Sequence, residues 1–221
     1  NGLITNKGYA TTSQVSQTAT DLTAKFSSSG GYNLLRNSVF TRDGSYWNLR
    51  GSTIDTSRTF NGHNSIKITS SGATSDVWKG IKQRFAENIP SGKTYTASLW
   101  YYVADKSTFN SNFALELKGK KAGATSEQAL KATSVAASNL VQGAWTRLTV
   151  TATTSEAWQY LHISPWVQKN GTIWITELQV EEGSLATLWT PHPSEIYDGI
   201  TQINKDGIKV YHNNINGENY T

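Results

Sequence analysis

Aromatic rings on an otherwise polar strand face are the residues in this sequence best suited to binding chemistry. The β-rich stretch Thr94–Val103 alternates in character, and alternate residues of a strand point to opposite faces. One face is apolar and reads as core: Tyr95, Ala97, Leu99, Tyr101 and Val103. The other face is polar yet ends in Trp100 and Tyr102. We therefore predict that this strand packs on one side and binds on the other.

Three further segments extend the same alternation to charged and aromatic side chains. In Ala157–Ser164 two aliphatic residues read inward, and three residues should point outward: Trp158, Tyr160 and His162. The same reasoning turns Glu116 and Lys118 outward in Asn112–Lys118, and Lys82 and Arg84 outward in Trp78–Phe85. If these strands neighbour Thr94–Ala104, we expect one ligand-binding surface formed by Lys82, Arg84, Trp100, Tyr102, Glu116, Trp158, Tyr160 and His162.

Catalysis is the function that the sequence supports least. It contains no Gly-x-Ser-x-Gly elbow, no His-Glu-x-x-His motif and no phosphate-binding Gly-Lys-Ser loop. Glu116 and Glu177 could act as a glycosidase pair only if their carboxyl groups lay roughly 5–9.5 Å apart across a cleft. Nothing in their spacing favours that arrangement, so we predict a protein that is not an enzyme.

Composition restricts the remaining classes. The chain has 221 residues, of which 16% are charged, and its net charge of +4 is spread without a basic run. Nucleic-acid binding is therefore not favoured. There is no Cys and hence no disulfide or thiolate chemistry. No stretch of about 18 apolar residues is present, so we expect no membrane span.

The chain changes character twice, which predicts three parts. Residues 1–31 contain a linker and a short helix, because Val15, Ala19, Leu22 and Phe26 form one helical stripe before a Ser-Gly run. Such a narrow stripe needs a partner, which is either the chain's own domain or a short parallel coiled coil; we favour the coiled coil. Residues 196–221 alternate isolated aliphatic residues with glycines and polar residues, which indicates the start of a β-rich oligomerisation stem or, alternatively, a disordered tail.

Residues 32–195 read as one all-β domain. Turn-rich text separates many short candidate strands, which is typical of an antiparallel jelly-roll β-sandwich. We treat Ser126–Ala132 as a loop. The predicted strands are Asn33–Phe40, Trp47–Ser52, Ser65–Thr69, Val77–Phe85, Thr94–Ala104, Asn112–Lys118, Ala144–Ala152, Trp158–Ser164 and Thr172–Val180.

Two pieces of sequence carry a family resemblance. The first is Tyr32–Phe40, and the second is Thr172–Glu195, which closes with an acidic pair, a glycine and Ala-Thr-Leu-Trp-Thr-Pro-His-Pro. Together with Gly62–Ile68, Trp78–Gln83 and Gly92–Thr96, they resemble the carbohydrate-binding-module-like jelly rolls in tail and baseplate proteins of phages of Gram-positive bacteria. The resemblance covers about residues 32–195.

This resemblance implies a binding role on a virus particle. We expect a homotrimeric tail-fibre, tail-tip or receptor-binding protein that holds a host cell-wall saccharide and contacts other tail proteins. Its aromatic rings would stack on sugar, and its polar groups would bind hydroxyls. The alternative is a structural spacer whose function is trimerisation. Related jelly rolls often hold a structural calcium, but Thr176 and Glu177 stand here where many relatives carry two Asp, so we expect no cofactor beyond an occasional Ca²⁺.

Overall fold

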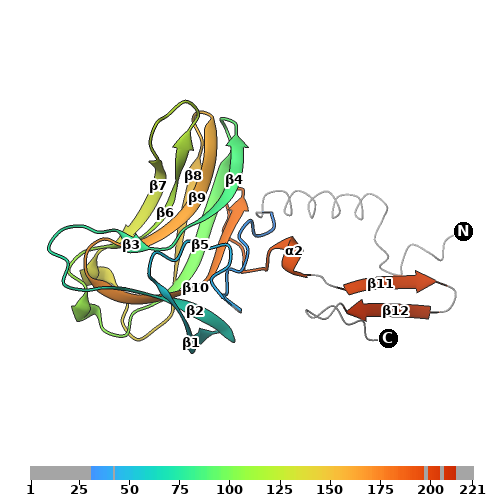
Figure 1. Cartoon of the computed structure of the whole chain (residues 1–221), viewed down its shortest axis with the longest axis horizontal. Coiled ribbons are helices and arrows are strands. Elements are labelled where there is room, and N and C mark those ends of the chain that lie inside the picture. Colours follow the sequence, from blue (N-terminus) through green and yellow to red (C-terminus); the bar gives the residue numbers. More distant parts are fainter. Residues whose placement is uncertain (1–30, 42, 197–198, 205–206, 213–221) are drawn as a thin grey trace, which may run out of the picture.

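A computed structural model describes residues 31–41, 43–196, 199–204 and 207–212, with side chains for residues up to 195. The helix and coiled coil expected in residues 1–31 lie outside the described residues, except for Gly31. Within the described part, strands dominate, and they form two five-stranded sheets and a separate two-stranded sheet (Figure 1).

The two large sheets are antiparallel and are built from strands distant in sequence. The first sheet has the order β1 (Thr53–Phe60), β2 (His63–Ser70), β10 (Gly171–Glu182), β5 (Thr94–Tyr102), β8 (Thr146–Thr153). The second has the order β3 (Lys79–Gly80), β9 (Trp158–Val167), β6 (Phe113–Lys121), β7 (Gln128–Val135), and β4 (Gln83–Ile89) also pairs with β9. Two short 3₁₀ turns, η1 (Lys106–Thr108) and η2 (Ala137–Asn139), lie in the connections.

The hydrophobic core lies between the two sheets. All five residues of the apolar face of β5 predicted from the sequence are buried, as are the inward residues of β6 such as Leu115 and Leu117. With no disulfide available, burial of this apolar area is what holds the sheets together. The expected jelly-roll β-sandwich is confirmed.

Several strand predictions were wrong at the edges of the sandwich. Asn33–Phe40 forms no strand, because Asn37 and Phe40 adopt left-handed backbone conformations and the segment folds into turns. Trp47–Ser52 contributes only an isolated bridge between Asn48 and Lys82. β1 was not predicted, and β7 occupies most of the segment treated as a loop, because both are exposed edge strands with little apolar alternation.

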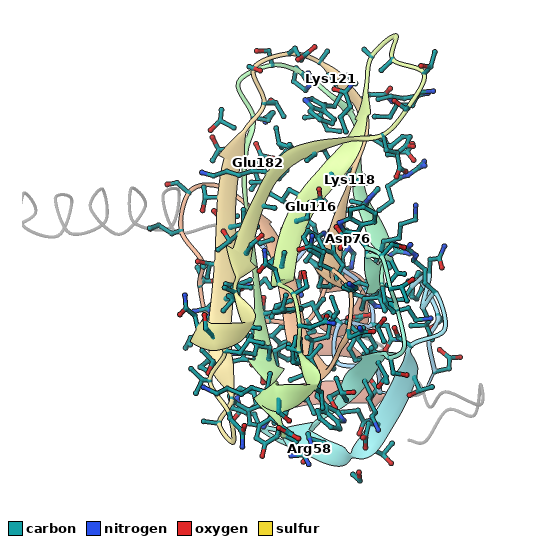
Figure 2. All side chains as sticks on the ribbon, turned by 90° about the vertical axis from the view of Figure 1, so that its left-hand side faces the viewer. Arg58, Asp76, Glu116, Lys118, Lys121 and Glu182 are labelled. Atoms are coloured by element: carbon teal, nitrogen blue, oxygen red, sulfur yellow. The ribbon has the colours of Figure 1, made fainter. Side chains whose placement is uncertain are left out.

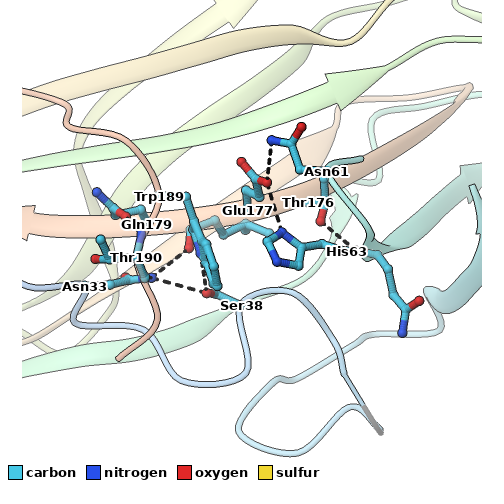
Figure 3. A network of polar contacts seen from close by, with 11 residues as sticks. Asn33, Ser38, Asn61, His63, Thr176, Glu177, Gln179, Trp189 and Thr190 are labelled. Carbon is cyan, nitrogen blue, oxygen red and sulfur yellow. Dashed lines mark hydrogen bonds and ion pairs between the residues drawn. The ribbon is translucent and has the colours of Figure 1, made fainter. Parts of the chain in front are cut away.

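A buried polar latch joins the beginning and end of the sandwich (Figure 3). The Asn33 side-chain amide donates to the carbonyl oxygens of Leu178 and Thr190 at 3.1 and 3.0 Å. Its Oδ1 accepts hydrogen bonds from the backbone N–H groups of Leu35 and Val180 at 3.0 and 3.2 Å. The Asn33 side chain thus satisfies backbone groups of two distant segments at once.

The closing motif completes this latch. The Trp189 indole N–H donates to Ser38 Oγ at 3.0 Å, and the Trp189 ring packs on His63 with centroids 4.6 Å apart. Glu177, at the irregularity in β10, accepts hydrogen bonds from Asn61 Nδ2 at 3.0 Å and from the His63 ring at 2.9 Å. The two pieces of sequence that carry the resemblance therefore meet in space.

Beyond the sandwich, the chain continues through a short helix, α2 (Pro193–Ile196). β11 (Gly199–Asn204) and β12 (Gly207–His212) then pair in an antiparallel hairpin. Their role as part of an oligomerisation stem stays a prediction. In the described residues, no helix is both long and apolar enough to cross a membrane.

Candidate functional site: two outer faces of the sandwich

The residues predicted to form one surface lie on two different faces. Trp100 and Tyr102 are on β5, on the outer face of the first sheet, whereas Tyr160 and Glu116 are on the outer face of the second sheet. The core separates the two faces, because stacked sheets pack about 10 Å apart with their inner side chains between them. The predicted single surface was wrong, because strand parity fixes the side of a sheet but not which sheet a strand joins.

The outer face of the first sheet, called here the ring face, holds a closed aromatic cluster. Phe60 reaches across from β1 and packs on Trp100 with ring centroids 4.7 Å apart, and on Trp145 at 5.3 Å. The Arg58 guanidinium lies 4.2 Å from the Tyr102 ring centre and 4.6 Å from that of Trp174. Each of these rings contacts another ring or the arginine; Phe60, Trp100, Tyr102 and Trp145 are partly exposed, and Trp174 is buried.

The outer face of the second sheet, called here the polar face, does collect five of the predicted residues: Lys82, Arg84, Glu116, Tyr160 and His162. A second carboxylate, Glu127, connects several of them. The Tyr160 hydroxyl donates to Glu127 at 3.1 Å, and Lys82 Nζ lies 3.5 Å from the same carboxylate. The Arg84 guanidinium stacks on the Tyr160 ring at 3.8 Å from its centre. Tyr160 is therefore held in one orientation.

A hollow of about 270 Å³, called here the central hollow, opens in the polar face. Its lining combines rings, charges and a hydroxyl: Arg50, Trp78, Glu116, Lys118, Ser164 and Trp166. The Trp166 indole N–H donates to Glu116 Oε2 at 3.0 Å, which orients both groups at the floor. Trp78, which was not among the predicted ligand residues, is 49% exposed.

The backbone at the rim of this hollow is unusual. Both Arg50 and Trp78 adopt positive φ angles, of 48° and 43°. Non-glycine residues in this region cost of order 1–3 kcal/mol and concentrate at ligand sites. Two of the residues that line the central hollow therefore hold backbone conformations that are uncommon for residues other than glycine.

A second hollow, of about 630 Å³, lies at the end of the same sheet near the loop after β6. Lys120 contributes to it, and its one aromatic lining residue is Trp158. Trp158 was predicted to point outward, but it is only 3% exposed and belongs to the core. The register shift between Lys120 and Lys121, opposite Trp158, breaks the alternation on which that prediction rested. This end hollow is larger but offers no exposed stacking ring.

His162 lies beside Tyr160 on the polar face and is uncharged at neutral pH. It is 3% exposed, and burial, aided by Lys82, Lys118 and Arg84, lowers the pKa of His162 to about 4 despite the nearby Glu127. Burial alone would raise the pKa of Glu127, but the Tyr160 hydroxyl and Lys82 hold it below its ordinary value. The polar face thus presents an ionised carboxylate and a neutral imidazole.

Sequence reasoning missed Trp78, Trp166, Arg50 and Glu127 as site residues. Trp166 could have been found, because it continues the parity of Tyr160 and His162 on a strand that is longer than predicted. The others come from loops, where strand alternation gives no guidance. Gly119 also marks the close approach of β6 and β9 beside the site. A Cβ at this position would lie 2.0 Å from the Tyr160 carbonyl oxygen, so only glycine permits the two strands to come this close.

Neither a metal centre nor a carboxylate pair is formed by the residues considered for these roles. The Glu177 carboxylate, the candidate calcium ligand, is already occupied by Asn61 and His63. Among the described residues, no group of three or more His, Asp or Glu could hold a metal ion. Glu116 and Glu177 lie on different sheets, on opposite sides of the core, so they do not flank one cleft.

The sandwich and the ring-lined hollow on an outer sheet face define a jelly-roll binding module. A family model described as "Carbohydrate binding domain" matches residues 32–172, and the chain belongs to this family. Domains of this family bind carbohydrate and are not catalytic themselves. No curated protein sequence matches the chain.

Solved structures share the fold at low sequence identity. The CBM22-1 xylan-binding domain of Paenibacillus barcinonensis Xyn10C is 16% identical, with a TM-score of 0.53 over 72% of this chain and 99% of that chain. The CBM22-1–GH10 modules of Clostridium thermocellum xylanase 10B, complexed with xylohexaose, are 15% identical, with a TM-score of 0.51. That match covers 69% of this chain and 29% of the other, whose printed name includes an enzyme module.

Proposed function

We propose that the polar face is the carbohydrate-binding surface of this module and that the central hollow is its main subsite. The observation that carries the proposal is the grouping of exposed Trp78 with Trp166 and Glu116 around one opening. Flat rings cover the apolar faces of sugars, and a carboxylate accepts hydrogen bonds from their hydroxyls. On the ring face, by contrast, the rings cover one another.

Each group would have a distinct role. Trp78, Trp166 and Tyr160 would stack on sugar rings; Glu116, Ser164 and Arg84 would hydrogen-bond hydroxyl groups. His162, buried and uncharged, would support the Tyr160 ring beside it. The central hollow is slightly smaller than the roughly 300–1,000 Å³ typical of small-molecule pockets, so each module would bind only weakly. Repetition of the module on one particle would raise the overall avidity.

We further propose that the module belongs to an adhesion device in the tail of a phage of Gram-positive bacteria. The resemblance of Tyr32–Phe40 and Thr172–Glu195 to such proteins supports this, as does the β-hairpin β11–β12 that follows the sandwich. In this setting the ligand is a host cell-wall saccharide, the protein is carried on the virion, and its partners are other tail proteins and two further copies of itself.

The test compares binding of a fluorescent fusion to Gram-positive cells and to their purified wall polysaccharide. Trp78→Ala removes an exposed ring with little cost to folding, and Trp166→Ala removes the ring at the floor. We expect each to weaken binding about tenfold or more, as for a central aromatic contact. Tyr32→Ala is the matched control, because Tyr32 is an exposed ring outside the central hollow.

Two outcomes would contradict the proposal. If Trp78→Ala and Trp166→Ala bind as well as the original protein, the central hollow is not the subsite. If the original protein sediments as a trimer but binds neither cells nor wall polysaccharide, the spacer function is favoured instead.

A further inference from the structure

The polar face carries an excess of positive charge that the sequence does not reveal. Five cationic side chains from three separate segments gather there: Arg50, Lys82, Arg84, Lys118 and Lys120. The nearby carboxylates are fewer, namely Asp76, Glu87, Glu116 and Glu127. In the sequence, only the short stretch Lys118–Lys121 concentrates lysines; the other cations are brought to this face by folding.

The cations differ in how far they are neutralised. Lys82 pairs with Glu127 at 3.5 Å and Arg84 pairs with Glu87 at 3.0 Å. Along the described part of the chain, Arg50, Lys118 and Lys120 have no ion-pair partner. These three cations therefore remain available to a ligand.

Two of these cations, Lys118 and Lys120, lie in line with Glu116 along β6. Glu116, Lys118 and Lys120 alternate on the outward face of this strand, about 7 Å apart. Figure 2 shows Glu116, Lys118 and then Lys121 in order along the strand, with Arg58 of the ring face at the other end of the view. Lys118 lines the central hollow and Lys120 lines the end hollow, so the line connects the two openings.

The carboxylates in the floor favour a saccharide over a bare polyanion. Glu116 is 9% exposed and is held by Trp166, so it meets the ligand at the centre of the site. A carboxylate there repels a uniformly charged chain such as a polyphosphate, but it accepts hydrogen bonds from sugar hydroxyls. The unpaired cations begin at Lys118, two residues further along β6.

From this arrangement, and resting on the proposed function, we infer that the ligand is an acidic glycan. A neutral sugar unit would lie on Trp78 and Trp166 above Glu116, and a carboxylate or phosphate group of the same chain would lie against Lys118 and Lys120. Lysine suits this role because its ammonium group acts as a point charge toward either kind of anion.

The experiment titrates the full chain with four probes by calorimetry. These are neutral xylan, polygalacturonate as a uronic-acid glycan, glycosylated polyglycerol phosphate as a phosphodiester glycan, and polyphosphate as an anion without sugar. We expect one of the two acidic glycans to bind about tenfold more tightly than xylan at about 0.05 M salt, and this advantage to shrink at about 0.5 M salt. The acidic glycan that binds more tightly shows whether the anionic group of the ligand is a carboxylate or a phosphate.

Charge-removing variants assign the effect to residues. Lys118→Gln and Lys120→Gln should each reduce acidic-glycan affinity several-fold and flatten its salt dependence, and each should weaken acidic-glycan binding more than xylan binding. Lys106→Gln is the matched control, because it removes the same charge from an exposed position in η1. A substitution of either strand lysine that leaves both quantities unchanged would overturn the inference.

The remaining outcomes separate this inference from the proposed function. If xylan binds as well as the acidic glycans at every salt concentration, the acidic ligand is ruled out while the binding face stands. Polyphosphate binding as tightly as the glycans would reduce the face to a general anion surface and overturn the inference. If no glycan binds while wall polysaccharide does, the ligand lacks the inferred chemistry; if neither binds, the proposed function fails.

Discussion

His162 shows how burial changes the chemistry of a single side chain. Alternation correctly placed it on the outward side of its strand, but the residue is buried, with the Tyr160 ring stacked beside it. Its depressed pKa means that the folded state disfavours the imidazolium, whereas the unfolded chain takes up the proton near pH 6.5.

We therefore predict an acid-sensitive contribution of His162 to stability. Between about pH 6.5 and its folded pKa of about 4, the unfolded state binds more protons, so the free energy of unfolding falls as the pH falls. The loss due to this residue should reach about 3 kcal/mol at most and be absent above about pH 7. Urea unfolding at both ends of this range measures it.

His162→Gln isolates this contribution from that of the carboxylates. The substituted protein should lose clearly less stability on acidification than the original. Equal losses in the two proteins would show that His162 is not the group responsible.

At the scale of elements, departures from regular alternation decided which residues reach the surface. The register shift opposite Trp158 directs this predicted ligand residue into the core. The irregularity in β1 lets the side chains of Phe60 and Arg58 reach across the outer face of the first sheet. Hydrogen bonds from Ser57 and Trp174 hold the pKa of Asp55 well below its usual range, so Asp55 is an ionised acceptor that secures this crossing. Sequence periodicity assumes regular strands and therefore cannot locate such shifts.

We predict that the latch between the beginning and end of the sandwich contributes to the free energy of unfolding. Asn33→Ala leaves buried backbone groups of Leu35, Leu178 and Val180 without partners, which should lower the free energy of unfolding by roughly 2–5 kcal/mol. Chemical denaturation measures the change. Asn139→Ala, at an exposed position in η2, should stay within about 0.5 kcal/mol of the original. A similar small effect at Asn33 would mean that the latch does not stabilise the sandwich.

At the scale of the whole molecule, the sandwich separates two surfaces that carry aromatic rings. On the ring face, the rings pack on one another and on Arg58. The polar face holds charges and an open hollow. The core between them prevents residues from the two faces from contacting one ligand unit.

This separation predicts opposite effects of two tryptophan substitutions. Trp100→Ala should lower the free energy of unfolding by roughly 1–3 kcal/mol, because it removes a half-buried ring from the cluster, and should leave glycan affinity unchanged. Trp78→Ala should weaken glycan binding and leave the free energy of unfolding nearly unchanged. Denaturation and glycan titration of both variants check this. If a well-folded Trp100→Ala protein no longer binds glycan, the ring face and not the polar face is the binding surface.

The sequence by itself determined the fold class, the inward face of each central strand and the outward position of Tyr160, Glu116, Lys82 and Arg84. These follow from local alternation and turn chemistry, which are properties of short segments. Only the tertiary structure decided that Trp100 and Tyr102 lie on the other sheet, that Trp158 is core, and that Trp78 and Arg50 meet Glu116. Sheet membership, bulges and loop positions depend on contacts between residues far apart in the chain, which no local pattern encodes.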